Sequence, residues 1–452
     1  MKYVPVLDKG FRPMYAEFKK YSEEAAKTEN KLLKICVERN DGYNYIYEYK
    51  IFANGHKDEN NLMAERIVKT ILWLVGGYKI YLAGDENVYE FIKAAYTDKG
   101  IRAFDKNFME RVYEKPFEVI MCDEKNFPKE KKCSLSVGGH LDGCRIGFDA
   151  GGSDRKVSAV IDGKVVYSEE VVWFPKINSD PDYHYNEILT ALKTAASKMP
   201  RVDAIGVSSA GVYVNNKIMV ASLFLKVNDE DFEKKVKTMY IDVAKELGEN
   251  IPLEVANDGD VTALAGAIDL NDDSVLGIAM GTSEAVGYIN NNGGLSELAF
   301  VPVDYNKNSM VDEWSGDYGC GVKYFSQDSV IKLAGMGGFK FDEKLSPAEK
   351  LKVVQKMMSD GDPLAKQIYE DIGTYLGHTM PFYAMFYGIK HVLLLGRVTS
   401  GLGGNIIMER ANKILEEEYP ELKFRIEMPD EKNRRVGQSI AAASLAATNK
   451  TK

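Results

Sequence analysis

Two acidic residues stand where carboxylates can do chemistry, and the first of them is Asp149. It follows the apolar residues 144–148, which predict a strand, and it opens the sequence DAGGSD. Gly151 and Gly152 allow a tight turn whose backbone amides approach a phosphate closely, and Ser153 adds a hydroxyl. The Asp149 carboxylate could hold a hydrated magnesium ion. The alternative is a hairpin whose glycines merely turn the chain.

The second acidic residue is Asp258, which follows Asn257 in the sequence VANDGDVTALAGA. A predicted strand ends at this pair and a predicted helix follows. Asp258 would therefore lie at the carboxyl end of a strand, the edge of an α/β sheet where ligands bind. A carboxylate there can accept a hydroxyl proton while the hydroxyl attacks a phosphoryl group. The alternative is helix capping, for which Asn, Asp and Gly are all favoured.

Two further glycine-containing turns follow predicted strands. The sequence SVLGIAMGTSEAVGYI places Gly281, Thr282 and Ser283 between two strands, which repeats the pattern of the first loop. The sequence HVLLLGRVTSGLGGN, residues 391–405, leads from a buried strand into a loop of four glycines, which suits a flat nucleotide base resting on backbone. One such loop is weak evidence, whereas four motifs in this order, each at a strand end, indicate a nucleotide site.

The elements that must position these motifs alternate between strands and helices. A linker rich in charges, Pro, Ser and Gly is predicted at residues 123–143. Beyond it, the pattern of apolar residues predicts strands at 144–148, 156–161, 164–172, 204–207, 253–256, 274–280, 285–290 and 391–395. It predicts helices at 185–197, 229–247, 346–358, 363–387, 405–419 and 437–447. Residues 144–452 thus contain two similar halves, each opening with a strand, a glycine-rich turn and a second strand.

The first 130 or so residues predict a small α+β module. Its strands are expected at 31–38, 43–52 and 78–82, and its helices at 61–74 and 86–96. Early strands do not suit a helix-turn-helix domain, which would open with closely spaced helices. The sequence reveals no role for this module.

Composition excludes several classes of protein. The chain has 452 residues, 45% of them hydrophobic and 28% charged, which is typical of a globular protein with two or three domains. A net charge of -9 argues against general nucleic-acid binding. No apolar run reaches the roughly 18 residues that a membrane span needs. The five cysteines are scattered without a C-x-x-C pair, which fits a reducing cytoplasm. From the charge, the apolar runs and the cysteines together, we expect a cytoplasmic protein that binds neither nucleic acid nor membrane.

The order and spacing of the four motifs resemble the ROK family (repressors, open reading frames and sugar kinases) of the actin-like ATPase superfamily. The resemblance extends from about residue 144 to the end. It implies an α/β fold of the actin-like, ribonuclease H-like type, duplicated into two lobes, here with an extra N-terminal α+β domain. We expect the N-terminal domain at residues 1–130 and the two lobes at 144–270 and 271–452.

The resemblance also implies an ATP-dependent, magnesium-requiring kinase that phosphorylates a hydroxyl of a sugar or sugar-like molecule. Asp258 would be the general base, and Asp149 would position magnesium through water. The residues expected to bind the acceptor are Asn257, Glu297, Ser209 and Gly211. Those expected to hold the phosphates and adenosine of ATP are Asp149, Gly151, Gly152, Ser153, Gly281, Thr282, Ser283, Gly396 and Gly401. A homodimer is expected.

The sequence departs from the family pattern in the acceptor region. Phe300 stands where family members carry a His, and Cys320 stands alone where they carry a cysteine-rich zinc loop. One thiol without His or Cys neighbours cannot close a tetrahedral site, so no structural zinc is expected. GVSSAG at residues 206–211 replaces the usual Gly-x-Pro-Gly. Other polar contacts to the acceptor could come from Ser208, Ser209, Asp317 and Tyr318, the alternative for each being ordinary loop packing or solvation.

Two other functions stay open. A sugar-sensing or regulatory protein that kept the fold and lost turnover is suggested by the altered acceptor loops. The retained Asn257–Asp258 pair, both phosphate loops and the absence of a recognisable DNA-reading helix pair argue against it. An actin-like filament-forming ATPase is the third possibility.

Overall fold

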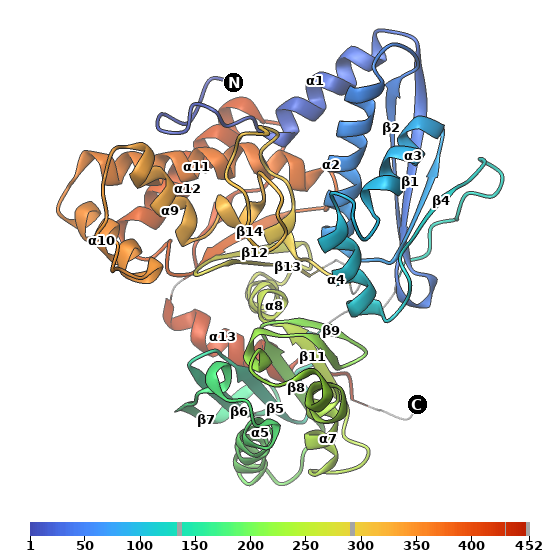
Figure 1. Ribbon diagram of the computed structural model, residues 1–452. Helices are drawn as coiled ribbons and strands as arrows, with labels where there is room; N and C mark the ends of the chain where they lie inside the picture. Colours follow the sequence, from blue (N-terminus) through green and yellow to red (C-terminus); the bar gives the residue numbers. More distant parts are fainter. Residues whose placement is uncertain (133–137, 290–293, 430, 449–452) are drawn as a thin grey trace. The chain divides into compact units, whose positions relative to one another are not determined.

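The computed structural model describes residues 1–132, 138–289, 294–429 and 431–448 (Figure 1). The chain forms two compact units. We call Met1–Ser134, Ile278–Val286 and Asn291–Met428 the N-terminal unit, and Leu135–Gly277, Gly287–Asn290 and Pro429–Lys452 the central unit. The predicted boundaries at residues 130, 144 and 270 stay a prediction. No helix within the described residues is both long enough and apolar enough to cross a bilayer.

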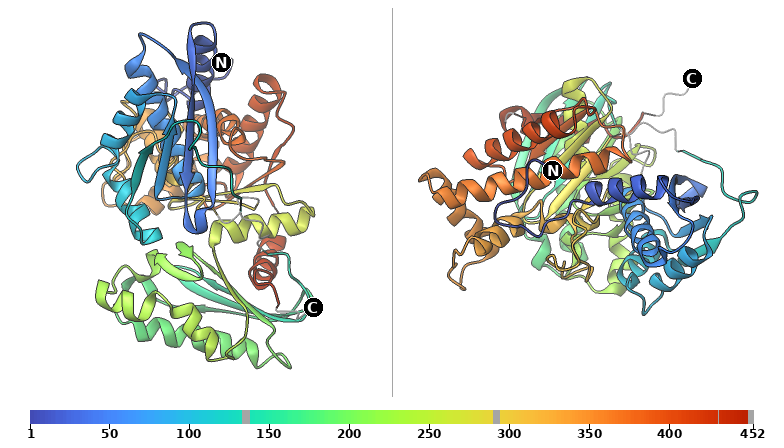
Figure 2. Two further views of the ribbon diagram at one scale, coloured as in Figure 1. Left: turned by 90° about the vertical axis from the view of Figure 1, so that its right-hand side faces the viewer. Right: turned by 90° about the horizontal axis from the view of Figure 1, so that it is seen from above.

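The N-terminal unit opens with a four-stranded sheet and four helices. The sheet has the order β2-β1-β3-β4, and β1 pairs antiparallel with β2 and β3 while β4 runs parallel to β3 (Figure 2). Its strands are β1 (Asn30–Glu38), β2 (Asn44–Phe52), β3 (Lys79–Ala83) and β4 (Glu118–Met121). The helices are α1 (Met14–Ala26), α2 (Lys57–Val75), α3 (Glu86–Ala95) and α4 (Ala103–Tyr113). The sequence did not predict α1, α4 or β4.

Helix α2 is the core element of this part of the chain. Nearly every side chain from Asn60 to Val75 is buried, including several charged ones. A helix that is buried all round must pack on several neighbours, and its charges must be paired.

The rest of the N-terminal unit is a second four-stranded sheet with helices. Its order is β13-β12-β14-β15, formed by β12 (Val275–Met280), β13 (Glu284–Tyr288), β14 (His391–Leu395) and β15 (Ile426–Glu427). The helices are α9 (Gln327–Met336), α10 (Pro347–Ser359), α11 (Pro363–Ala384) and α12 (Leu402–Glu418). The first residues of β12 and the last of β13 belong to the central unit. The wholly apolar β14 confirms the predicted strand, and four of its five residues are buried.

The central unit contains a five-stranded sheet of order β11-β8-β5-β6-β7. Strands β5 (Cys144–Ala150), β6 (Asp154–Ile161) and β7 (Lys164–Val172) form an antiparallel meander, while β8 (Ala204–Ser209) and β11 (Leu253–Asn257) run parallel to β5. Its helices include α5 (Pro181–Ala196), α8 (Asp258–Leu270) and α13 (Glu431–Ala443). The carboxyl ends of β5, β8 and β11 therefore meet at one edge, as the prediction for Asp149 and Asp258 requires.

The C-terminal helix α13 packs on this sheet and on α8. Ala441, Ala442 and Leu445 share an apolar cluster with Val261 and Leu264 of α8. The small residues permit a close approach, because a Cβ on Gly147 of β5 would lie 2.6 Å from the carbonyl oxygen of Ser439.

The single helix predicted at 229–247 is wrong. The segment contains α6 (Asp229–Asp231), a π-helical turn (Phe232–Val236) and α7 (Met239–Lys245). The amide of Lys237 donates to the carbonyl of Phe232, and the Lys237 carbonyl accepts from Ile218 of strand β10 (Lys217–Val220). A tertiary hydrogen bond thus takes the carbonyl that would have continued the helix.

Candidate functional site

Asn257 and Asp258 lie where β11 passes into α8. Asn257 caps the helix, since its Oδ1 accepts a 2.8 Å hydrogen bond from the Gly259 amide. Its Nδ2 donates to the carbonyl of Gly211, also at 2.8 Å, so the structure brings together two residues predicted to bind the acceptor. Asn257 is therefore the residue that caps α8. The Asp258 carboxylate, which also accepts from Gly259 at 3.1 Å, is left with unused acceptor capacity.

The electrostatics around Asp258 favour a base. Burial, followed by the charge of Asp149, raises the pKa of Asp258 to about 6. Burial and the charge of Asp258 raise the pKa of Asp260 to about 8. At neutral pH Asp258 is therefore mostly ionised and Asp260 mostly protonated. A carboxylate with a pKa near 6 is a better proton acceptor than an ordinary aspartate and still keeps its charge at pH 7.

Asp149 lies at the carboxyl end of β5, beside Ser208 of β8 and opposite Lys156 of β6. Burial raises its pKa, which the Lys156 charge and a hydrogen bond from Ser208 oppose. Asp149 lines a cavity of about 200 Å³ together with Lys156, Val165, Ser168, Glu170, Gln438 and Ser439. The hard carboxylate oxygens of Asp149 suit a hydrated magnesium ion. No group of three His, Cys, Asp or Glu side chains in the described part of the chain could hold a metal ion unaided.

The first phosphate loop joins β5 to β6. Trp173 holds it, donating from Nε1 to the Gly151 carbonyl at 2.7 Å and from its amide to Ser153 at 3.2 Å. Neither Gly151 nor Gly152 has a positive φ. Gly151 is instead required by the lack of room for a side chain, because a Cβ at this position would lie 2.5 Å from the carbonyl oxygen of Asp154. Gly152 and Ser153 are exposed, as a phosphate loop requires.

Ser209 is the predicted acceptor ligand that the structure places least favourably. Its side chain is fully buried, and its hydroxyl accepts a hydrogen bond from the Tyr240 hydroxyl at 3.2 Å. Its role in acceptor binding stays a prediction.

The second phosphate loop, in the N-terminal unit, follows β12. The Gly281 amide donates to the Ser283 carbonyl at 3.0 Å, and the Gly281 carbonyl accepts from Gln327, the first residue of α9, at 2.9 Å. These bonds set the turn and leave the Thr282 and Ser283 side chains exposed. Two hydroxyls are therefore available to a ligand.

The glycine loop after β14 lies beside this turn, since the Val398 amide donates to the Met280 carbonyl at 3.0 Å. Gly396 has φ 99° and Gly401 has φ 75°, a conformation that favours glycine. A cavity of about 250 Å³ opens where α12 begins, lined by Gln355, Met358, Ser359, Tyr369, Ser400, Gly401, Leu402 and Gly403. The structure thus places Gly401 in the lining of a cavity, while Gly396 lies outside that lining.

Glu297 is held by the N-terminal α+β module. Its amide donates to the Trp73 carbonyl at 2.9 Å, and the Ser296 amide donates to the Leu74 carbonyl at 3.2 Å. These are carbonyls of the last turn of α2, which have no partners within their own helix. The Phe300 ring packs against Trp73 in a tilted arrangement, with ring centroids 4.4 Å apart. The module that the sequence left without a role therefore fixes the backbone that carries Glu297.

A buried ion cluster anchors the following loop to the same helix. Asp317 accepts hydrogen bonds from Arg66, Lys69 and Arg102, and every one of these side chains is at most 4% exposed. Because three cations occupy its oxygens, Asp317 is not the acceptor ligand considered from the sequence. Cys320 lies beside this cluster, with its Sγ 3.8 Å from the Lys69 Nζ, and burial raises its pKa to about 11.

Sequence reasoning missed Glu284, which directly follows the second phosphate loop. It is 4% exposed, and neither carboxyl oxygen has a hydrogen-bond partner among the described residues. Burial, helped by the charge of Glu297, raises the pKa of Glu284 well above the usual range of a carboxyl group. The sequence feature that could have drawn attention to Glu284 is an acidic residue at the start of an otherwise apolar strand.

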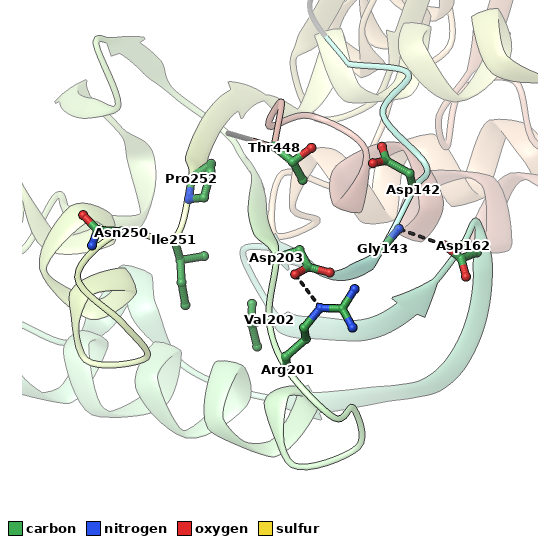
Figure 3. A pocket seen from close by; sticks show the side chains of 10 residues that line it. All are labelled: Asp142, Gly143, Asp162, Arg201, Val202, Asp203, Asn250, Ile251, Pro252 and Thr448. Carbon is green, nitrogen blue, oxygen red and sulfur yellow. Dashed lines mark hydrogen bonds and ion pairs between the residues drawn. The ribbon is translucent and has the colours of Figure 1, made fainter. Parts of the chain in front are cut away.

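A larger cavity of about 550 Å³ lies at the other edge of the central sheet (Figure 3). Its lining includes Gly143, Asp203 and Pro252, which precede β5, β8 and β11, so it opens at the amino ends of these strands. Its Arg201 pairs with Asp203 at 2.7 Å, and Asp162 accepts from the Gly143 amide at 2.8 Å. Polar groups that are paired with one another indicate a structural role, and the chemistry of Asp149 and Asp258 lies at the opposite edge.

Comparison with solved structures defines the class of fold. A ROK family transcriptional regulator, a homologue of the E. coli Mlc protein, is 17% identical and matches with a TM-score of 0.53 over 68% of this chain and 79% of its own. The ROK hexokinase from Thermus thermophilus is 16% identical and matches with a TM-score of 0.51 over 66% of this chain and 97% of its own.

The chain therefore has the α/β fold of ROK proteins, which is the actin-like ATPase fold, and the predicted resemblance is confirmed at that level. The matched structures include both a sugar kinase and a regulator. No protein-family model and no curated protein sequence matches the chain.

Proposed function

We propose that this protein is an ATP-dependent kinase that phosphorylates a hydroxyl of a sugar or sugar-like molecule. The observation that carries the proposal is Asp258. It follows the carboxyl end of β11, which runs parallel to β8, the neighbouring residue Asn257 caps the helix, and the pKa of Asp258 is raised to about 6. Perturbed carboxylate pKa values of this kind are typical of catalytic acids and bases.

In the proposed reaction the acceptor hydroxyl attacks the terminal phosphorus of ATP. The bond from that phosphorus to the ADP oxygen breaks, and the hydroxyl proton passes to Asp258. Asn257 of the central unit and Glu297 of the N-terminal unit are each proposed to contact the acceptor. Asp149 is the residue that would hold magnesium, which would supply positive charge to offset that of the phosphates.

Each unit would offer its own groups to ATP. In the central unit, the exposed Ser153 hydroxyl would bind phosphate. In the N-terminal unit, the exposed hydroxyls of Thr282 and Ser283 would bind phosphate, and the cavity at Gly401 would take the base. Because the net charge is -9, local amides, hydroxyls and magnesium must attract ATP in place of a basic surface.

An acceptor screen tests the proposal. Hexoses, amino sugars and polyols are each mixed with the protein, ATP and magnesium, and both ATP consumption and melting temperature are followed, since a ligand that binds the native state raises its apparent stability. We expect at least one acceptor to cause both ATP consumption and a thermal shift.

The second candidate is a sugar-responsive regulator, favoured by the match to a ROK transcriptional regulator and by the altered acceptor loops. Thermal shifts with sugars and nucleotide but no ATP consumption with any acceptor would favour it over the kinase.

A further inference from the structure

Lys176 lies against the first phosphate loop of the central unit. It belongs to Pro175–Ile177, a single 3-10 turn that follows β7. A Cβ placed on Gly152 would lie 2.8 Å from the Cε of Lys176 and 3.0 Å from its Nζ. The side chain of Lys176 therefore passes through space that is open only because residue 152 is a glycine.

The turn that carries Lys176 is fixed to the loop. The two hydrogen bonds from Trp173 to Gly151 and Ser153 join the segment to the loop, and the buried His184 ring lies with Nε2 3.0 Å from the Pro175 carbonyl. The backbone that leads into Lys176 is thus anchored at Trp173 and Pro175, while the lysine side chain itself is exposed. Within the described residues it makes no ion pair.

Lys176 also acts on the proposed base. Its charge lowers the pKa of Asp258, opposing the effects of burial and of Asp149. This effect is the smallest of those that set the pKa of Asp258, and it is the contact with Gly152 that places the Lys176 ammonium at the loop that would hold phosphates. Lys156 acts on Asp149 in the same direction, so Lys176 adds a second positive charge near the two carboxylates.

We propose that Lys176 binds the terminal phosphoryl group of the nucleotide and stabilises the charge on it during transfer, an inference that rests on the proposed kinase function. A lysine on a four-carbon stem suits this role, because its ammonium is a compact charge that can follow a moving phosphoryl group. Positively charged groups placed at a transferring phosphoryl group are a large part of catalysis in such enzymes.

Two substitutions separate charge from shape. Lys176→Met removes the charge and keeps an unbranched stem, while Lys176→Arg keeps the charge. Lys164→Met is the matched control, since Lys164 is also an exposed lysine of the same meander. It lies at the end of the meander away from the loop, because it pairs with Ile161, which pairs with Cys144 at the start of β5. We expect kcat to fall about 100- to 1,000-fold in Lys176→Met, to recover in part in Lys176→Arg, and to be unchanged in Lys164→Met.

Binding gives a readout that needs no turnover. The non-hydrolysable analogue AMPPNP carries a terminal phosphoryl group and AMP does not. By titration calorimetry with magnesium, Lys176→Met should weaken AMPPNP binding about tenfold or more and leave AMP binding unchanged. NMR titration of the nucleotide-free protein can follow the pKa values of Asp149, Asp258 and Asp260. The pKa of Asp258 should be higher in Lys176→Met than in the wild type, and it should be unchanged in Lys176→Arg and Lys164→Met.

The outcomes distinguish this inference from the proposed function. Equal AMPPNP affinity in wild type and Lys176→Met, or no AMPPNP binding by the wild type, overturns the role of Lys176. Selective loss of AMPPNP binding in a protein that phosphorylates no acceptor supports the role of Lys176 and contradicts the kinase.

Discussion

Arg66 donates two hydrogen bonds, both 3.1 Å long, to the two carboxylate oxygens of Asp317, which lies 251 residues further along the chain. Lys69 and Arg102 donate to the same carboxylate. This buried contact joins α2 of the N-terminal module to the loop that follows Glu297. It makes the module part of the structure that positions the proposed acceptor site.

Removing the charge of Asp317 should destabilise the protein strongly. Asp317→Asn leaves buried cations without their shared anion, and breaking a buried pair in this way typically costs about 3–5 kcal/mol. Denaturant unfolding measures the loss. The matched control is Asp360→Asn, which breaks the exposed pair with Lys356 and should cost about 0–1 kcal/mol. Similar losses of unfolding free energy in the two variants would show that the buried cluster stabilises the protein no more than an exposed ion pair does.

The acidic side of the pH–rate profile should report Asp258. The base must be ionised to accept a proton, so kcat/KM should fall as the pH drops through about 6, the raised pKa of Asp258. Steady-state rates from pH 4.5 to 8.5, with stability checked at each pH, give the value. An acid limb near the ordinary aspartate pKa of about 4 would argue against this assignment.

Asp260 should make stability fall as the pH rises. Its pKa in the folded protein is about 8, above the unfolded value of about 3.9, so the native state holds the extra proton between these values. Where the native state binds more protons than the unfolded state, stability decreases with pH. Asp260→Asn should therefore have a smaller decrease in unfolding free energy between pH 5 and pH 8 than the wild type. Parallel curves for the two proteins would refute the shift.

Filling the cavity at Gly401 should weaken ATP binding selectively. Ser359 lies in its wall, and Ser359→Trp places a large ring where the base is expected. The KM for ATP should rise about tenfold or more while the KM for the acceptor changes little. Ser197→Trp is the control, because Ser197 is likewise an exposed serine near a helix C-terminus whose hydroxyl donates to the preceding turn. An unchanged KM for ATP in Ser359→Trp would place the base elsewhere.

Local sequence patterns predicted the elements that carry the chemistry. The short apolar run 391–395 predicted a buried strand, and the structure has β14 at the same residues. The acid and glycines of 149–152 predicted the end of β5 and a tight turn, which the structure confirms. In each of these cases the determining residues are neighbours in sequence.

Contacts between distant residues could not be predicted in this way. The partners of Asp317 lie more than 200 residues away, so its burial among cations left no local signal. Lys176 is separated from Gly152 by two strands, and only the folded meander brings them together. The break in the predicted helix at 229–247 likewise depends on Ile218 of another element. Such features follow from tertiary packing, which overrides local propensity.

The central claim is that Asp258 is the general base, and Asp258→Asn tests it most directly. With an acceptor from the screen, kcat should fall about 100- to 10,000-fold while the affinity for AMPPNP stays within a few fold. Asp260→Asn is the matched control, because Asp260 is mostly protonated at pH 7 and its amide replacement should keep most of the activity. Turnover by Asp258→Asn close to that of the wild type would contradict the account.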